Sequence, residues 1–100
     1  MGKLVRDRIP EIIQEDGKPP IIRIVDEEEY VRELDRKLCE EVEEYRADGS
    51  IEEMADVLEV LQAICIARGY TLKQLEEVRR KKAAERGGFK KRIYWEGNQD

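Results

Sequence analysis

The chain contains no histidine, and this absence removes several classes of catalytic site at once. Without imidazole there is no Ser–His or Cys–His nucleophile pair and no histidine-ligated metal. The two cysteines, Cys39 and Cys65, lie in apolar helical sequence without a Cys-x-x-Cys spacing. We therefore expect buried free thiols, and neither a disulfide nor a zinc site.

Long apolar runs are also missing. No run approaches the roughly 20 residues that a membrane span needs, and the first six residues meet charge too early for a secretory signal. We therefore expect a cytoplasmic protein that does not contact a membrane. The 24 acidic residues outnumber the 19 basic ones, and the net charge of −5 argues against nucleic acid as a partner.

One hundred residues predict a single domain over residues 1–100. A short helix is expected over residues 7–16. The two adjacent prolines at 19 and 20 and the β-branched residues after them then predict an extended N-terminal arm. Capping signals and glycine breaks predict three longer helices over residues 26–47, 50–68 and 71–86. The expected fold class is all-α, a bundle of about four helices.

Two acidic clusters repeat a pair of carboxylates three residues apart. Residues i and i+3 share a helix face, so the two pairs become parallel if their helices pack side by side. The pairs are Glu41 with Glu44, and Glu53 with Asp56. In a chain that is 43% charged most acidic residues simply solvate a helix face, but Glu41 falls inside an apolar stripe. That stripe consists of Tyr30, Val31, Leu34, Leu38, Val42 and Tyr45.

The helix that carries the second pair is apolar nearly all round over residues 57–67, which predicts a central position. Glu53 and Asp56 share one side of it with Val60, Ile64 and Ala67. Unpaired carboxylates in such surroundings are destabilising, and a divalent cation would remove the penalty. Oxygen ligands favour Mg²⁺ or Mn²⁺ over zinc or copper. Because Mg²⁺ keeps positions open for phosphate oxygens, the pattern points to phosphoryl or nucleotidyl chemistry.

The acidic pattern has the form Glu-Glu-x-x-Glu, then a turn, then Glu-x-x-Asp, at residues 40–44 and 53–56. It resembles the defining motif of the MazG-like, all-α nucleoside triphosphate pyrophosphohydrolases. That superfamily also contains dimeric dUTPases and the phosphoribosyl-ATP pyrophosphohydrolase of histidine biosynthesis. Residues 3–10 and 82–89 are similar to a small single-domain subgroup labelled phosphoribosyl-ATP pyrophosphohydrolase-like, so the similarity spans nearly the whole chain.

The resemblance implies Mg²⁺-dependent hydrolysis of a nucleoside triphosphate, including non-canonical ones, to a monophosphate and pyrophosphate. The implied metal ligands are Glu41, Glu44, Glu53 and Asp56. The implied catalytic group consists of Glu40, Glu41 and Glu44, with Glu40 as a candidate for activating the water. The chemistry fits independently, because an in-line attack needs charge neutralisation at the phosphate and a carboxylate that orients or deprotonates water.

Four basic residues are candidates for substrate binding. Lys82 and Arg86 match cations that the family uses to hold the phosphates, although Arg80 stands where the family has an asparagine. Lys3 and Arg6 could clamp a triphosphate as charge-assisted donors. The ordinary alternative for such an N-terminal segment is solvent exposure or ion pairing.

Self-association is the last expectation, as a homodimer or a dimer of dimers. Residues 57–67 are too apolar for a chain of this size to cover with its other helices. A second copy would also bring Lys82 or Arg86 over the acidic site of the first. Two alternatives remain open: true phosphoribosyl-ATP hydrolysis, and a non-catalytic helical module for oligomerisation or regulation.

Overall fold

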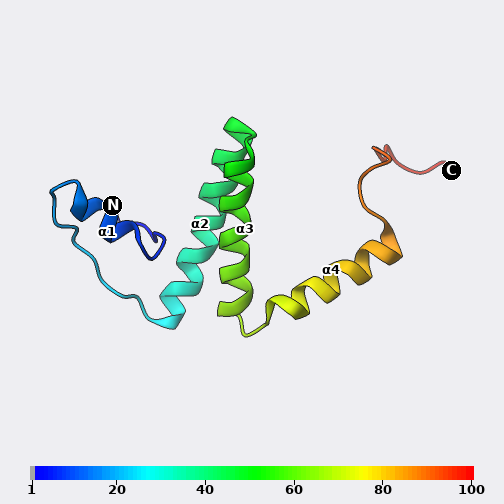
Figure 1. Ribbon diagram of the computed structural model, residues 1–100. Helices are drawn as coiled ribbons and strands as arrows, with labels where there is room; N and C mark the ends of the chain where they lie inside the picture. The colour runs from blue at the N-terminus through cyan, green and yellow to red at the C-terminus, as the bar shows by residue number, and fades with distance from the viewer. Residues whose placement is uncertain (1) are drawn as a thin grey trace.

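The computed structural model describes residues 2–100, and within that range the chain contains four α-helices and no strand. The helices are α1 (Ile9–Glu15), α2 (Glu27–Asp48), α3 (Ile51–Ala67) and α4 (Leu72–Arg86), as Figure 1 shows. The all-α prediction is confirmed, and each helix boundary lies within two residues of the expected one, which is the ordinary uncertainty at helix ends.

Each long helix begins at its predicted capping residue. The side chains of Asp26, Ser50 and Thr71 each accept a backbone N–H from the residue three positions later. Thr71 forms the complete reciprocal capping box. At Asp26 the expected return bond is replaced, because Arg23 engages the Glu29 carboxylate. These caps satisfy N–H groups that a helix leaves unpaired in its first turn.

Helices α2 and α3 form an antiparallel hairpin that carries nearly all of the close packing between helices in residues 2–100 (Figure 1). Gly49 ends α2 with a φ of 71°, and its N–H bonds back to the carbonyl of Tyr45. This left-handed conformation is strained for residues with a side chain, so glycine permits the tight turn into α3. The turn places the two acidic motifs on facing helices.

The core of the hairpin is small. Leu34, Val60 and Cys65 are its buried apolar residues, and several neighbours on the same faces are half-buried. The half-buried neighbours are Val31, Leu38, Val42, Ile64 and Ala67. Tyr30 and Tyr45, the ends of the predicted stripe, are exposed.

The expectation of two buried thiols is right for Cys65 and wrong for Cys39, which is exposed. Cys39 lies on α2, and the neighbouring positions that pack against α3 are Leu38 and Glu41. Because successive helix positions are rotated by about 100°, a residue flanking the packed stripe can turn towards solvent. An apolar sequence context therefore did not decide the burial of this thiol.

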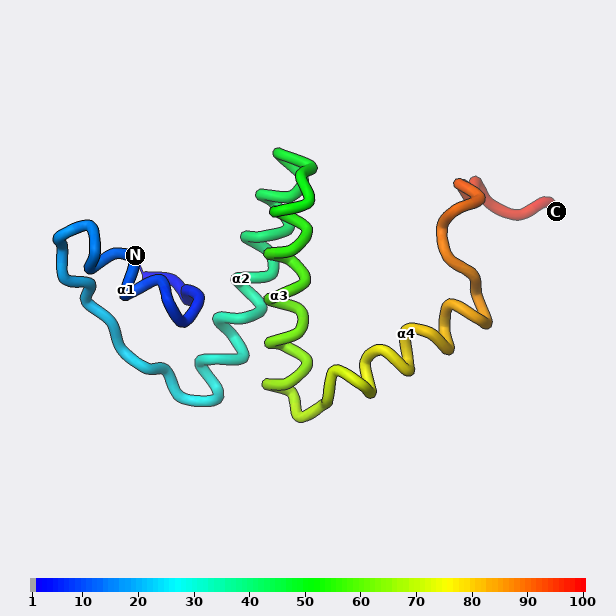
Figure 2. Tube along the Cα trace, viewed as in Figure 1, coloured from blue at the N-terminus to red at the C-terminus, as the bar shows by residue number. Residues whose placement is uncertain are grey.

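Helix α4 projects away from the hairpin on the side opposite the N-terminal segment (Figures 1 and 2). It contacts α3 only near their connection and is exposed along nearly its whole length. The radius of gyration is 18.1 Å, whereas a compact domain of this length has about 13 Å. The chain therefore has the helices of a bundle but packs just two of them closely.

Residues 18–26 connect α1 to α2 without a helix or a strand. Among residues 2–100, no helix combines the length and the apolar character needed to cross a membrane. The structure thus agrees with the sequence on the helical elements, and it differs from the expected bundle in that only α2 and α3 pack closely.

Leu34 tests the placement of the hairpin core, because its side chain is 4% exposed. Leu34→Ala should lower the free energy of unfolding by about 2–4 kcal/mol, as buried leucines do when a cavity replaces them. Ile21→Ala is the control, since Ile21 is fully exposed, and its effect should stay within about 0.5 kcal/mol. Urea denaturation measures both. Equal effects at the two positions would contradict the core assignment.

Candidate metal centre

Three carboxylates meet between α2 and α3, in the half of the hairpin next to the turn. Glu41 comes from α2, and Glu53 and Asp56 come from α3. One oxygen atom of each residue lies within 4.8 Å of an oxygen of the other two. Three converging oxygen donors at this separation suit a hard divalent cation.

Glu41 is the most deeply placed charge of the cluster. The residue is 7% exposed, its Oε1 lies 3.3 Å from Lys37 Nζ, and its Oε2 is buried without a hydrogen-bond partner among residues 2–100. Glu53 Oε2 is likewise buried and unpartnered within that range. Buried polar atoms in proteins are almost always bonded, so these two oxygens could accept a positively charged ligand.

The helix periodicity explains why Glu41 is buried and Glu53 is half-buried. Glu41 follows Leu34 by seven residues on α2, and Glu53 precedes Val60 by seven residues on α3. Seven residues are two helical turns, so each carboxylate continues the stripe of its helix that faces the other helix. The core of the hairpin therefore changes from apolar to acidic along its length.

Glu44 and Glu40 border this cluster in two different ways. Glu44 is exposed one turn after Glu41, and the neighbouring Glu41 carboxylate raises the pKa of Glu44. Glu40 accepts hydrogen bonds from Lys3 at 3.2 Å and from Lys37 at 3.3 Å. These ammonium groups, Lys3 first, hold the pKa of Glu40 below its usual value. The two glutamates therefore differ in how readily they take up a proton.

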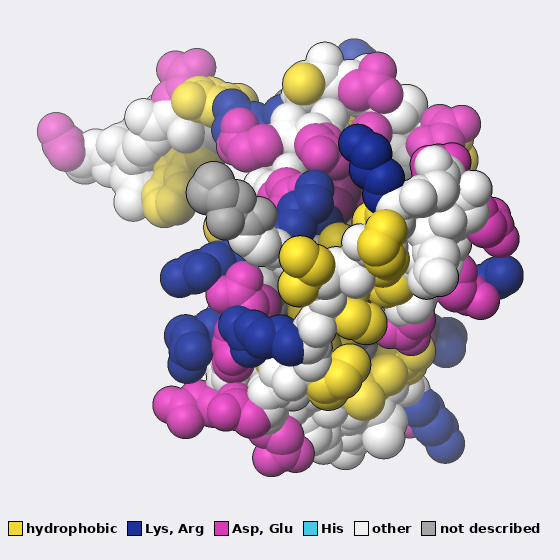
Figure 3. All heavy atoms as spheres, turned by 90° about the vertical axis from the view of Figure 1, so that its left-hand side faces the viewer, with side chains coloured by type: hydrophobic (Ala, Val, Ile, Leu, Met, Phe, Trp, Pro, Cys, Tyr) yellow, Lys and Arg dark blue, Asp and Glu magenta, His cyan; other side chains and the backbone are white. Residues whose placement is uncertain are grey.

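Of the four predicted substrate-binding cations, Arg6 contacts the cluster and Lys3 contacts Glu40 at its border. Arg6 Nη2 donates to Asp56 Oδ1 at 2.6 Å, and Lys3 Nζ donates to Glu40. Figure 3, which views the molecule from this side, shows basic side chains lying among the acidic ones. Lys82 and Arg86 instead lie exposed on α4, which leaves the hairpin on the opposite side (Figure 1).

Lys37 is a residue of the cluster that the sequence reasoning missed. Its ammonium lies 3.3 Å from carboxylate oxygens of both Glu40 and Glu41. The signal was present, because positions i, i+3 and i+4 are neighbours on a helix and basic–acidic pairs at this spacing attract each other. Lys37 offsets part of the negative charge that would otherwise be buried with Glu41.

Comparison with known proteins gives one partial relative. An uncharacterized protein of Mycolicibacterium smegmatis is 55% identical to the chain over 47 residues, which is 47% of this chain and 48% of that protein. The chain thus matches about half the length of this relative. No family model and no solved structure matches the chain. Membership of the MazG-like superfamily therefore stays a prediction.

The surroundings of Glu53 disfavour its ionised form. Partial burial is the largest cause that raises the pKa of Glu53, followed by repulsion from Asp56, Asp48 and Glu41. Glu44 shifts in the same direction because of Glu41. Both groups carry excess repulsion at neutral pH, which a cation would relieve.

These two shifts predict an unusual dependence of stability on pH. The ordinary pKa is 4.5 for both groups, and their folded-state values are higher, so their ionised forms destabilise the fold at neutral pH. This destabilisation decreases as the pH falls through the raised pKa values towards 4.5, because the two carboxylates take up protons. In the presence of a chelator, Tm should therefore rise as the pH is lowered from about 7 to about 5.

Glu53→Gln should raise Tm at pH 7 and flatten the profile, because the amide carries no charge. Glu59→Gln, at an exposed position of the same helix, is the matched control and should leave the profile unchanged. Differential scanning calorimetry across the pH window measures all three proteins. A wild-type Tm that falls steadily from pH 7 to pH 5 would contradict the account.

Proposed function

We propose that the chain hydrolyses a nucleoside triphosphate to a nucleoside monophosphate and pyrophosphate, with Mg²⁺ or Mn²⁺ held by Glu41, Glu53 and Asp56. The observation that carries this proposal is the Glu41 carboxylate, which is buried with one oxygen unpartnered among residues 2–100 and faces two further carboxylates. A surface cluster of glutamates would be solvated and would need no ligand. A buried one needs positive charge beyond the single ammonium of Lys37.

The donor set fits the proposed cation. All three residues offer carboxylate oxygens, which Mg²⁺ and Mn²⁺ prefer, and three protein ligands leave coordination positions for phosphate oxygens and water. When bound, Mg²⁺ supplies positive charge that offsets the charge of the phosphate oxygens in the transition state. The resemblance of residues 40–44 and 53–56 to the MazG-like motif supports the same assignment.

Glu44 suits the role of the base better than Glu40 does. A water oxygen attacks the α-phosphorus, its proton passes to a carboxylate, and the bond from the α-phosphorus to the oxygen of the leaving pyrophosphate breaks. A base works best when its pKa lies near the working pH. The pKa of Glu44 is raised, whereas that of Glu40 is lowered by Lys3 and Lys37. Because Glu41 is buried, we assign it to the cation and not to proton transfer.

A pyrophosphate-release assay over canonical, modified and phosphoribosyl nucleotides tests the reaction. With Mg²⁺ or Mn²⁺ present, Glu53→Gln and Asp56→Asn should each reduce the rate at least about 100-fold, because each removes a ligand of the cation whose positive charge stabilises the transition state. Glu59→Gln should retain the wild-type rate. Circular dichroism should show wild-type helix content in all three variants.

The same assay separates the alternatives. Turnover of phosphoribosyl-ATP above all other nucleotides would assign the chain to that reaction. No pyrophosphate release from any nucleotide, by a wild-type protein with normal helix content, would contradict catalysis and favour a non-catalytic helical module. Normal turnover in both carboxylate variants would show that the catalytic residues lie elsewhere.

We further infer that two or more copies of the chain assemble through α3 and α4. The accessible surface is 9578 Å², whereas a compact monomer of 11.8 kDa exposes about 5,900 Å². The exposed surface includes apolar side chains: Met54, Leu58 and Leu61 are exposed on α3. A soluble monomer seldom leaves a surface of this kind open.

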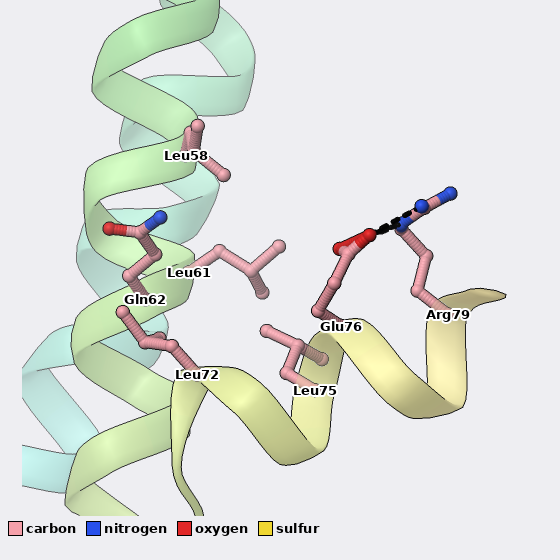
Figure 4. A pocket seen from close by; sticks show the side chains of 7 residues that line it. All are labelled: Leu58, Leu61, Gln62, Leu72, Leu75, Glu76 and Arg79. Carbon is pink, nitrogen blue, oxygen red and sulfur yellow. Dashed lines mark hydrogen bonds and ion pairs between the residues drawn. The ribbon is translucent and has the colours of Figure 1, made fainter.

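A cleft between α3 and α4 gathers part of this apolar surface. It has a volume of about 390 Å³ and is lined by Leu58, Leu61, Leu72 and Leu75. Leu61 and Leu75 point towards each other across it, and the Glu76–Arg79 ion pair lies at its rim (Figure 4). A helix from a second copy would fill such a cleft with apolar side chains. The arrangement would also let α4 of one copy carry Lys82 and Arg86 to the cluster of the other.

Light scattering over a dilution series tests the assembly. The wild-type protein should have the mass of a dimer or tetramer at micromolar concentration. Leu61→Glu should shift it towards monomer, because a charge in a buried apolar contact is strongly destabilising. Ile21→Glu, which places the same charge at a fully exposed residue, is the control. A stable monomer that is active at nanomolar concentration would contradict the shared core and the shared site together.

A further inference from the structure

The N-terminal segment, residues 2–8, is attached to the α2–α3 hairpin at the acidic cluster. Within residues 2–100, two hydrogen-bonded ion pairs join this segment to the hairpin: Lys3 with Glu40, and Arg6 with Asp56. Apolar support is slight, since Leu4 is half-buried and Val5 is exposed. The position of the segment therefore depends on the charge of the carboxylates.

Arg6 engages one of the three carboxylates that form the proposed cation site. Its Nη2 lies 2.6 Å from Asp56 Oδ1, and Asp56 is also within 4.8 Å of the oxygens of Glu41 and Glu53. A guanidinium and a divalent cation at the same carboxylate repel each other, and both need its negative charge. Their binding at Asp56 is therefore antagonistic.

The side chain of Arg6 can leave its contact with Asp56 without disturbing a helix. Its side chain is 54% exposed, and it belongs to the irregular segment ahead of α1, so a change of side-chain rotamer disturbs no helix. Exposed ion pairs are weak because water solvates both partners. A guanidinium that loses its carboxylate also matches phosphate oxygens, with two parallel N–H donors.

We propose that Arg6 is an exchangeable counter-ion: it holds Asp56 in the cation-free protein, is displaced when a divalent cation binds, and then binds a phosphate of the substrate. This inference rests on the proposed function, since it assumes the cation site. The cation must bind before the anion, because Arg6 is free to bind the anion only after the cation has displaced it. It also gives Arg6 opposite effects on the two binding steps.

Arg6→Gln separates these effects. Titration with Mn²⁺, followed by the electron paramagnetic resonance signal of the free ion, should show about threefold tighter binding in the variant, because the competing ion pair is gone. Calorimetric titration with inorganic triphosphate in saturating Mg²⁺ should show about tenfold weaker binding, because a charge-assisted donor is lost. Tighter cation binding with weaker anion binding is the signature of exchange.

Arg8→Gln is the matched control, because Arg8 pairs with Glu11 in α1 and not with the cluster. It should change neither affinity. Arg6→Lys retains the positive charge, so it should keep Mn²⁺ affinity near the wild-type value.

Unchanged or weaker Mn²⁺ binding in Arg6→Gln would overturn the exchange while leaving the cation site in place. Weaker binding of both Mn²⁺ and triphosphate would show that Arg6 has a structural role, and this result would also overturn the exchange. A wild-type protein that binds no Mn²⁺ would refute the proposed function itself, which the wild-type titration alone reveals.

Discussion

The buried carboxylate of Glu41 is the constraint around which the hairpin is organised. A charge 7% exposed between two helices is tolerated only with compensation, since burial of an unpaired charge is strongly unfavourable. Lys37 supplies part of that compensation from the preceding turn of α2. The facing residues Glu53 and Asp56 add negative charge, which Arg6 offsets in part at Asp56. In the proposed enzyme a divalent cation would offset more of it. The acidic half of the hairpin is thus less stable than an apolar core would be, as is common at functional sites.

The small apolar core makes this compensation more important. Leu34, Val60 and Cys65 are the buried apolar residues of the described chain, which is little to offset both buried charge and the entropy of ordering the helices. Two sources of stability are open to the chain: positive charge at the cluster, and apolar burial against another copy. In the proposed enzyme both sources of stability come from components that the reaction needs. The divalent cation completes the site, and the second copy supplies basic side chains from α4.

The sequence predicted the helices well, since caps, glycine breaks and apolar stripes are local signals that the structure retains. It also predicted that Glu41, Glu53 and Asp56 share the facing sides of two helices. Glu44 did not join them: it lies beside Glu41 but is exposed to solvent, at the edge of the contact between the two helices. The packing of α4 and the exposure of Cys39 were beyond local signals, since both depend on which surfaces another element covers. The contact of Lys37 with Glu41 could be predicted from their spacing. The helix contains many such pairs, however, so the spacing did not single out Lys37.

The most direct test of the central claim is a crystal structure of the protein with Mn²⁺, using the anomalous signal of the metal. The account predicts an anomalous peak about 2.1 Å from oxygens of Glu41, Glu53 and Asp56, between α2 and α3. Lys37 should remain beside Glu41. A structure that shows Mn²⁺ bound elsewhere, or that shows the three carboxylates with no peak at saturating Mn²⁺, would contradict it.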